Sequence, residues 1–229
     1  MCGICGILGR RLNATARREV VQRMMAAVAH RGPDDSALHE SSGATLGHQR
    51  LSIIDLVSGR QPMASADGRH VIVYNGEIYN YLELREALVR DGVVFRTASD
   101  TEVLLELLIR EGPAALRRLN GMFAFVLLDT VEDKWLMARD PLGVKPLYFT
   151  ELPDEIAFGS EPKALLAHPA VRAEPSDLGG PGQEPHSYPG HDVASKKWRR
   201  SQAQHRNLRR NRRRQDHPAQ RPVGFHSGG

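Results

Sequence analysis

Met1-Cys-Gly-Ile-Cys-Gly-Ile-Leu8 opens the chain and sets how its fold begins. The stretch is apolar and uncharged, so we expect a short buried β-strand over residues 2–8. Cys2 and Cys5 are the only cysteines in the sequence. A C-x-x-C pair is also typical of redox and zinc sites, but a redox pair is expected to open a helix after a strand, and zinc needs about four ligands. We therefore expect reduced thiols and no metal site.

The following residues form groups of strands and groups of helices. Arg31-Gly-Pro ends the first helical stretch, because glycine and proline interrupt helices. Ser99 and Glu102 have the spacing of a helix-capping pair, as do Asn80 and Glu83. The expected helices are residues 15–30, 80–92 and 99–110, and the expected strands are 43–54, 70–74, 123–128 and 134–138. Grouped elements predict an α+β fold of mostly antiparallel sheets faced by helices.

Composition divides the chain near Ser176. Residues 1–176 contain 20 Lys and Arg against 23 Asp and Glu, whereas residues 177–229 contain 11 against 4. The second segment has only five Leu, Ile, Val or Phe residues, too few to offset the entropy of ordering it. We expect one domain over 1–176 and a disordered basic tail over 177–229.

The sequence shows no targeting segment at its start. A charged stretch followed by a long apolar one is absent, and no apolar run approaches about 18 residues. We expect a cytoplasmic protein with no membrane partner.

Cys2 gains a chemical role from its position. If Met1 is removed, its thiol is the nucleophile and its own α-amine, with an ordinary pKa of about 7.7, is the base. A plain strand cysteine is the alternative interpretation.

The motifs around this cysteine resemble those of the class II glutamine amidotransferases, and most closely the glutaminase half of glutamine-hydrolysing asparagine synthetases. Seven stretches within residues 1–173 occur in the family's order. They are Met1-Cys-Gly-Ile-Cys-Gly-Ile-Leu, Arg31-Gly-Pro-Asp-Asp-Ser, Gly47-His-Gln-Arg-Leu-Ser-Ile-Ile-Asp, Tyr74-Asn-Gly-Glu-Ile-Tyr-Asn, Ser99-Asp-Thr-Glu-Val, Gly121-Met-Phe-Ala-Phe and Ala138-Arg-Asp-Pro-Leu-Gly-Val-Lys-Pro-Leu-Tyr. The resemblance implies a four-layer αββα sandwich, the N-terminal nucleophile hydrolase fold. It also implies that Cys2 attacks the glutamine amide, forms a thioester and releases ammonia.

Asn75 and Gly76 are the expected oxyanion donors, through a side-chain N–H and a backbone N–H. Glycine at this position would also let the substrate approach closely. Taken alone, an Asn-Gly pair after a strand is more typical of a hairpin turn.

The family positions imply a glutamine-binding set. Arg50 suits the α-carboxylate, Asp100 suits the α-ammonium with Glu77 assisting, and Ile53 and Ile54 line the pocket. The alternatives are a surface ion pair for Arg50 and helix capping for Asp100.

Two further features have lesser expected roles. The loop that begins at Arg31 is expected to shape the site, and His48 is expected to be a structural histidine, with a catalytic base as the alternative. Gln49 differs mildly from the residues that are frequent at this position of the family motif.

The resemblance ends near Ser176, and the ATP-dependent synthetase domain is not expected in this chain. We hypothesise a truncated or frameshifted synthetase that acts as a glutaminase only. The glutaminase step needs no cofactor and no metal, whereas ATP and magnesium belong to the absent domain. The expected partners are glutamine, a synthetase domain in cis (lost) or in trans, and a possible second copy of the chain.

Other interpretations remain open. Within the class they are other asparagine-synthetase-like amidotransferases and the glutaminase halves of glucosamine-6-phosphate synthase and of the phosphoribosylamine-forming enzyme, although Tyr74-Asn-Gly-Glu and Leu51-Ser-Ile-Ile-Asp-Leu disfavour the last two. In another class, a catalytically silent scaffold could carry a nucleic-acid-binding tail. No aromatic residues are interleaved with the tail's arginines, so nucleic acid is not an expected partner.

Overall fold

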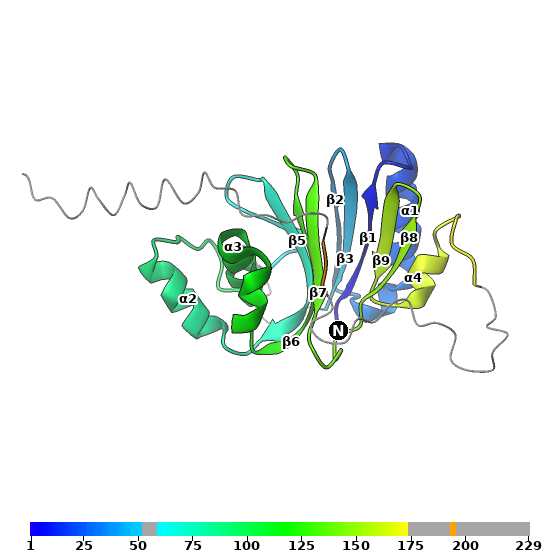
Figure 1. Ribbon diagram of the computed structural model, residues 1–229. Coiled ribbons are helices and arrows are strands. Elements are labelled where there is room, and N and C mark those ends of the chain that lie inside the picture. Colours follow the sequence, from blue (N-terminus) through cyan, green and yellow to red (C-terminus); the bar gives the residue numbers. More distant parts are fainter. Residues whose placement is uncertain (52–58, 174–192, 196–229) are drawn as a thin grey trace, which may run out of the picture. The chain divides into compact units, whose positions relative to one another are not determined.

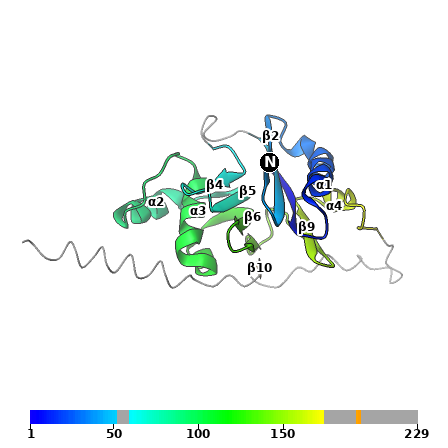
Figure 2. The ribbon, with the colours of Figure 1, turned by 90° about the horizontal axis from the view of Figure 1, so that it is seen from above.

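Two five-stranded antiparallel sheets pack face to face with helices on both outer faces (Figure 1). The computed structural model describes residues 1–51, 59–173 and 193–195. From above, helices α1 (Ala14–Ala27) and α4 (Pro162–Leu166) flank one sheet, and helices α2 (Tyr81–Arg90) and α3 (Asp100–Glu111) flank the other (Figure 2). The predicted αββα arrangement is confirmed.

The first sheet contains the N-terminal strand at its centre, in the order β2-β3-β1-β9-β8. Its strands are β1 (Gly3–Gly9), β2 (Asp35–Glu40), β3 (Ala44–Arg50), β8 (Tyr148–Leu152) and β9 (Glu155–Gly159). Helices α1 (Ala14–Ala27) and α4 (Pro162–Leu166) cover its outer face. A 3-10 turn, η1 (Ala29–Arg31), follows α1.

The second sheet has the order β10-β7-β6-β5-β4. Its strands are β4 (Met63–Ala64), β5 (His70–Ile78), β6 (Gly121–Asp129), β7 (Lys134–Arg139) and β10 (Val193–Ser195). Helices α2 (Tyr81–Arg90) and α3 (Asp100–Glu111) cover its outer face, and the 3-10 helix η2 (Gly112–Arg118) follows α3.

Side chains alternate across the central strands and so divide the core into three layers. On β1, Ile4 and Leu8 lie between the sheets, whereas Cys5 and Ile7 pack against α1 and α4. On β5 and β6 the same alternation sends one set of side chains between the sheets and the other toward α2 and α3. Both faces of each central strand are therefore buried, which explains the nearly continuous apolar composition of residues 2–8.

Helix α1 buries an arginine as well as its predicted apolar face. The Arg17 side chain donates hydrogen bonds to Thr45 Oγ1 at 3.0 Å, Gly9 O at 3.1 Å and Ser41 O at 2.7 Å. These bonds tie the end of β1 to the β2–β3 connection and satisfy the buried guanidinium.

The capping predictions have different outcomes at the two helices. Ser99 accepts a hydrogen bond from Glu102 N at 3.3 Å and begins α3 as predicted. Asn80 precedes α2 but makes no capping bond. It donates instead to Arg118 O at 2.9 Å and accepts from Asn120 N at 3.0 Å, so it joins two loops.

Most of the predicted basic tail lies outside the described residues. Its three described residues, Val193–Ser195, form strand β10 and pair antiparallel with β7 instead of being disordered. None of the described helices combines the length and apolar character that crossing a membrane requires.

Candidate active site

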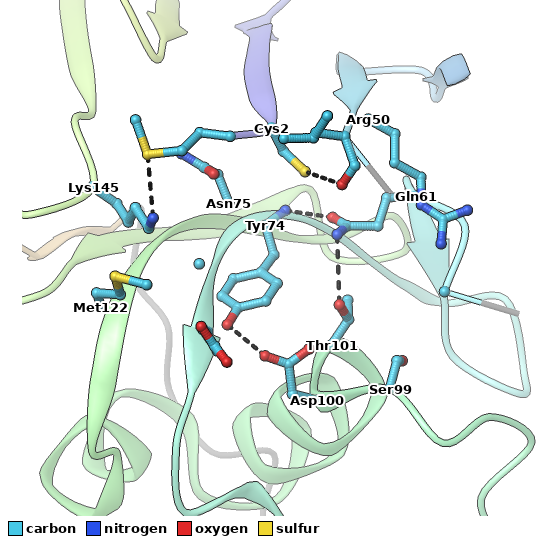
Figure 3. Close-up of a pocket in the computed structure, with 15 residues that line it drawn as sticks. Cys2, Arg50, Gln61, Tyr74, Asn75, Ser99, Asp100, Thr101, Met122 and Lys145 are labelled. Atoms are coloured by element: carbon cyan, nitrogen blue, oxygen red, sulfur yellow. Dashed lines mark hydrogen bonds between the residues drawn. The ribbon is translucent and has the colours of Figure 1, made fainter. Parts of the chain in front are cut away.

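A pocket of about 130 Å³ opens where β1 begins and β3 and β5 end, beside the start of α3 (Figure 3). It brings together Cys2, Arg50, Asn75, Gly76, Glu77 and Asp100 from the predicted site. Its other lining residues are Met1, Leu51, Gly59, Gln61, Tyr74, Ser99, Thr101, Met122 and Lys145. Residues more than 90 positions apart in sequence therefore share one small cavity.

The two cysteines have different environments. Cys2 lines the pocket, and its Sγ donates to Leu51 O at 3.6 Å. Cys5 is fully buried among the residues beneath α1, and burial raises the pKa of its thiol. Residues three apart on a strand face opposite ways, so a joint C-x-x-C site is not supported. Both thiols are free.

Arg31 and Glu161 hold the backbone of Cys2. Arg31 Nε donates to Cys2 O at 3.0 Å, and its Nη1 donates to Glu161 Oε1 at 2.9 Å. Burial acts to raise the pKa of Glu161, but hydrogen bonds from Arg31, Lys163 and His30 outweigh it and lower this pKa to about 2. The carboxylate stays ionised and fixes Arg31, whereas the shaping role of the loop that begins at Arg31 stays a prediction.

Ser160 fixes Ile4, two residues after Cys2. Ile4 N donates to Ser160 Oγ at 2.9 Å, and Ser160 N donates to Ile4 O at 2.8 Å. Cys2 is thus held on a strand end bonded on both sides, a rigid support for a reacting group.

Asn75 and Gly76 lie inside β5, paired with Ala124 and Phe123 of β6. The hairpin-turn interpretation of the Asn-Gly pair is therefore wrong. Asn75 is 3% exposed, and its Nδ2 has no hydrogen-bond partner in the described part of the chain. A buried amide donor without an acceptor is costly, so this N–H is a candidate ligand donor.

Gly76 is required by the sheet. A Cβ at Gly76 would lie 2.4 Å from Met122 O and 2.7 Å from the Phe123 Cα. The glycine thus lets β5 and β6 approach, in addition to any benefit for a ligand.

Asp100 faces the pocket from the first turn of α3. Its Oδ2 accepts hydrogen bonds from Tyr74 Oη at 2.7 Å and Ile78 N at 3.1 Å. Burial raises its pKa, although these donors act in the opposite direction. Burial and the Asp100 charge raise the pKa of Tyr74, so the phenol remains a proton donor. Asp100 does not cap α3, because Ser99 does.

The amino-acid sequence matches the model of a glutamine amidotransferase domain over residues 1–179. This match spans well over half of the chain. The chain belongs to the glutamine amidotransferase domain family.

Curated relatives of this amidotransferase domain are asparagine synthetases. It is 42% identical over 168 residues to asparagine synthetase [glutamine-hydrolyzing] 1 of Bacillus subtilis, covering 72% of this chain and 27% of that protein. It is 44% identical over 166 residues to asparagine synthetase [glutamine-hydrolyzing] 2 of Arabidopsis thaliana (72% and 28%). It is 41% identical over 167 residues to asparagine synthetase B of Escherichia coli (72% and 30%). The chain thus spans less than a third of each.

Two solved structures share the fold of the amidotransferase domain. A glutamine phosphoribosylpyrophosphate amidotransferase from B. subtilis has a TM-score of 0.59 at 22% identity, over 72% of this chain and 43% of that one. An allosteric regulatory enzyme of purine biosynthesis has a TM-score of 0.61 at 23% identity, with the same coverages.

The remaining predicted residues of the amidotransferase domain have distinct positions. Arg50, at the end of β3, is 6% exposed and lines the pocket, so a surface ion pair is not its setting. Ile53 and Ile54 lie outside the described residues. No group of three or more His, Cys, Asp or Glu side chains that could hold a metal occurs in the part of the chain the structure describes.

His48 sits under the pocket as a buried link between the sheets. Its Nε2 lies 3.3 Å from Tyr74 O, and burial lowers its pKa to about 4. It does not line the pocket, which agrees with the predicted structural role.

The pocket residues that the sequence did not assign to the site include Gln61, Tyr74 and Lys145. Gln61 Oε1 accepts a hydrogen bond from Tyr74 N at 2.6 Å, and its Nε2 lies 3.5 Å from Thr101 Oγ1. Gln61 therefore joins β5 to α3 across the pocket. Tyr74 and Lys145 lie in motifs that the sequence did single out, but their direction depends on the tertiary fold.

Proposed function

We propose that this domain hydrolyses glutamine to glutamate and ammonia through a thioester on Cys2. The observation that carries the proposal is the unpartnered Nδ2 of buried Asn75 in the pocket that also contains the Cys2 thiol. An amide-cleaving cysteine needs a donor for the oxyanion of its tetrahedral intermediate. Asn75 offers such a donor.

In the proposed reaction, removal of Met1 frees the α-amine of Cys2. The amine takes the thiol proton, directly or through water, and the thiolate attacks the side-chain carbonyl carbon of glutamine. Asn75 Nδ2 and Gly76 N stabilise the oxyanion. The protonated amine then gives its proton to the leaving nitrogen, which departs as ammonia. Water hydrolyses the glutamyl thioester, releasing glutamate and restoring the thiol.

The same pocket offers groups for the two charges of the substrate. Arg50 would bind the α-carboxylate through its planar fork. Asp100 and Glu77 would bind the α-ammonium, and Ile53 and Ile54 would contact the aliphatic stem. The bonds from Tyr74 and Ile78 support Asp100 in this role, because they fix its orientation and oppose the effect of burial on its pKa. We propose that this step uses no cofactor and no metal.

We further propose that the ammonia serves asparagine synthesis. The names of the curated relatives support this acceptor. The acceptor would be activated by a synthetase domain, in cis or in trans, to which ATP and magnesium belong. A cytoplasmic location and a homodimer are part of the same proposal. Another asparagine-synthetase-like amidotransferase with a different carboxylate acceptor is the alternative.

Ammonia release from glutamine tests the hydrolytic step. Three proteins are compared: the processed chain that begins at Cys2, its Cys2→Ala variant, and a chain that retains extra residues before Cys2. We expect activity in the first alone, because the second lacks the nucleophile and the third lacks the free amine. Equal ammonia release from all three would refute the mechanism.

A further inference from the structure

Lys145 is a buried cation in the pocket whose side chain has no carboxylate partner among the described residues. It is 6% exposed and lines the cavity beside Cys2 and Asn75 (Figure 3). Its Nζ contacts Met1 Sδ at 3.3 Å. A thioether is a weak acceptor and an ammonium carries three donors. This contact therefore leaves most of the hydrogen-bonding capacity of the lysine unused.

The backbone that carries Lys145 is rigid. The Asp140 carboxylate accepts hydrogen bonds from four backbone N–H groups, those of Phe123, Leu142, Val144 and Lys145, at 2.9 to 3.2 Å. In this loop Leu142 and Val144 are exposed, whereas Lys145 turns inward. The fold therefore directs this ammonium into the pocket.

The Lys145 ammonium lies near the nitrogen that becomes the α-amine of Cys2. Met1 Sδ is five covalent bonds from that nitrogen, an extended reach of about 6 Å. Together with the contact between Lys145 and Met1, this limits the distance between Nζ and the Cys2 nitrogen to roughly 9 Å. Removal of Met1 takes away the sulfur partner and frees the amine in the same step.

Other charged groups surround Cys2, and each has a separate interaction. Arg31 bonds Cys2 O and is paired with Glu161, which also bonds His30 and Lys163. The Asp140 carboxylate is occupied by backbone donors. Tyr74 stays protonated and His48 stays neutral at pH 7, because burial raises the first pKa and lowers the second.

The remaining charges face the substrate. When glutamine is bound as proposed, Arg50 pairs with its carboxylate, and Asp100 and Glu77 pair with its ammonium. Lys145 then remains as a positive charge facing the amine. A nearby like charge disfavours protonation of an amine.

We propose that Lys145 keeps the α-amine of Cys2 in its neutral, proton-accepting form at physiological pH. This inference rests on the proposed function, since it assigns the amine as the base. Lys145 acts through the amine and is a positioning residue, not a catalytic one. A positive charge within roughly 9 Å lowers the pKa of the amine by direct repulsion, because the protonated amine would carry a like charge.

The pH dependence of kcat for ammonia release, which reports the glutamine-bound enzyme, tests this role in processed wild type, Lys145→Met and Lys145→Arg. Methionine keeps a long apolar stem without the charge, and arginine keeps the charge. We expect the acidic limb of Lys145→Met to move upward by about 0.3 to 1.3 pH units, which is about a 2- to 20-fold loss below the limb. The limb of Lys145→Arg should stay near that of the wild type. A lower kcat in Lys145→Met with an unmoved limb would overturn the proposal.

A direct titration keeps the test independent of the folding of any variant. Because the chain has 2 cysteines, [15N]cysteine labelling leaves only the Cys2 amine and the Cys5 amide to resolve. We expect the Cys2 amine of the wild type to titrate below the ordinary value of about 7.7. Titration at or above that value would overturn the proposal, even if Cys2-dependent ammonia release persists. Loss of the proposed function would show separately, as ammonia release that survives Cys2→Ala.

Discussion

Each end of strand β5 has a carboxylate beside it, Asp129 buried at one end and Asp100 partly buried at the other, and the two carboxylates have different hydrogen-bond partners. At the His70 end, Asp129 accepts bonds from Arg69 Nη2 at 2.6 Å and from the backbone N–H groups of Val131 and Glu132 at 3.0 Å. Burial alone would raise its pKa, yet these donors lower it. The charge is satisfied within the chain.

At the other end of β5, Asp100 accepts hydrogen bonds from a phenol and a backbone N–H and has no cation partner among the described residues, and burial raises its pKa. The adjacent Asn75 amide keeps a donor without an acceptor in the described part of the chain. A folded chain satisfies most buried polar groups. Among the described residues, the pocket end thus has a carboxylate without a cation and an amide donor without an acceptor, whereas the Asp129 carboxylate is paired with Arg69.

Asn75→Ala, at the pocket end of β5, should have the largest effect on catalysis. We expect kcat for ammonia release to fall by about 10² to 10³, the usual cost of losing one oxyanion donor, with little change in KM. Steady-state kinetics measures this split. The matched control is Asn80→Ala, which removes an asparagine that bridges two loops and should cost stability but not kcat. Equal losses of kcat in both variants would contradict the oxyanion role.

Asp129→Asn, at the His70 end of β5, should lower the stability of the protein and leave its catalytic rate unchanged. Replacing a buried carboxylate that bonds Arg69 and two backbone donors should lower the free energy of unfolding by about 1 to 3 kcal/mol. Denaturant unfolding at pH 7 measures it. Because the folded pKa is lowered, this contribution is present above the ordinary pKa of about 3.9 and is lost as pH falls through the folded pKa. A drop in kcat at unchanged stability would contradict the comparison.

Tyr74→Phe should have a smaller effect, on the KM for glutamine. Loss of the hydroxyl removes a donor from Asp100 and raises its pKa further, so less of it is ionised to bind the glutamine ammonium at acidic pH. We expect KM to rise by about 5- to 10-fold, corresponding to about 1 to 1.4 kcal/mol, and more as pH falls. The ratio of KM between pH 8 and the lowest pH at which the protein stays folded measures this. A KM that is independent of both pH and the hydroxyl would argue against Asp100 as the ammonium ligand.

The sequence predicted the central strands and most of the candidate site because their signals are local. Residues 2–8 are apolar on both faces, and Ser99 with Glu102 marks the start of α3. It did not predict edge strand β2, whose residues Asp35–Glu40 are mostly polar, or the β8–β9 hairpin, which turns at Asp154 with a positive φ of 62°. Edge strands and non-glycine turns carry weak patterns.

Site residues to which a sequence motif assigns a role were predicted. Residues whose side chains reach the pocket only through the tertiary fold were missed. Cys2, Asn75 and Asp100 stand in quoted motifs and meet in one pocket. Gln61 enters the pocket by bonding the backbone of Tyr74, an interaction with no sequence pattern. Lys145 depends on the backbone bonds to Asp140. The catalytic and binding roles of all these residues stay predictions.

The most direct test of the account is the mass of the intact protein after a rapid acid quench during glutamine turnover. We predict a chain that has lost Met1 and has gained one glutamyl group, mapped to Cys2 and absent from Cys2→Ala. Ammonia release without a glutamyl adduct on Cys2, or turnover by a chain that retains Met1, would contradict it.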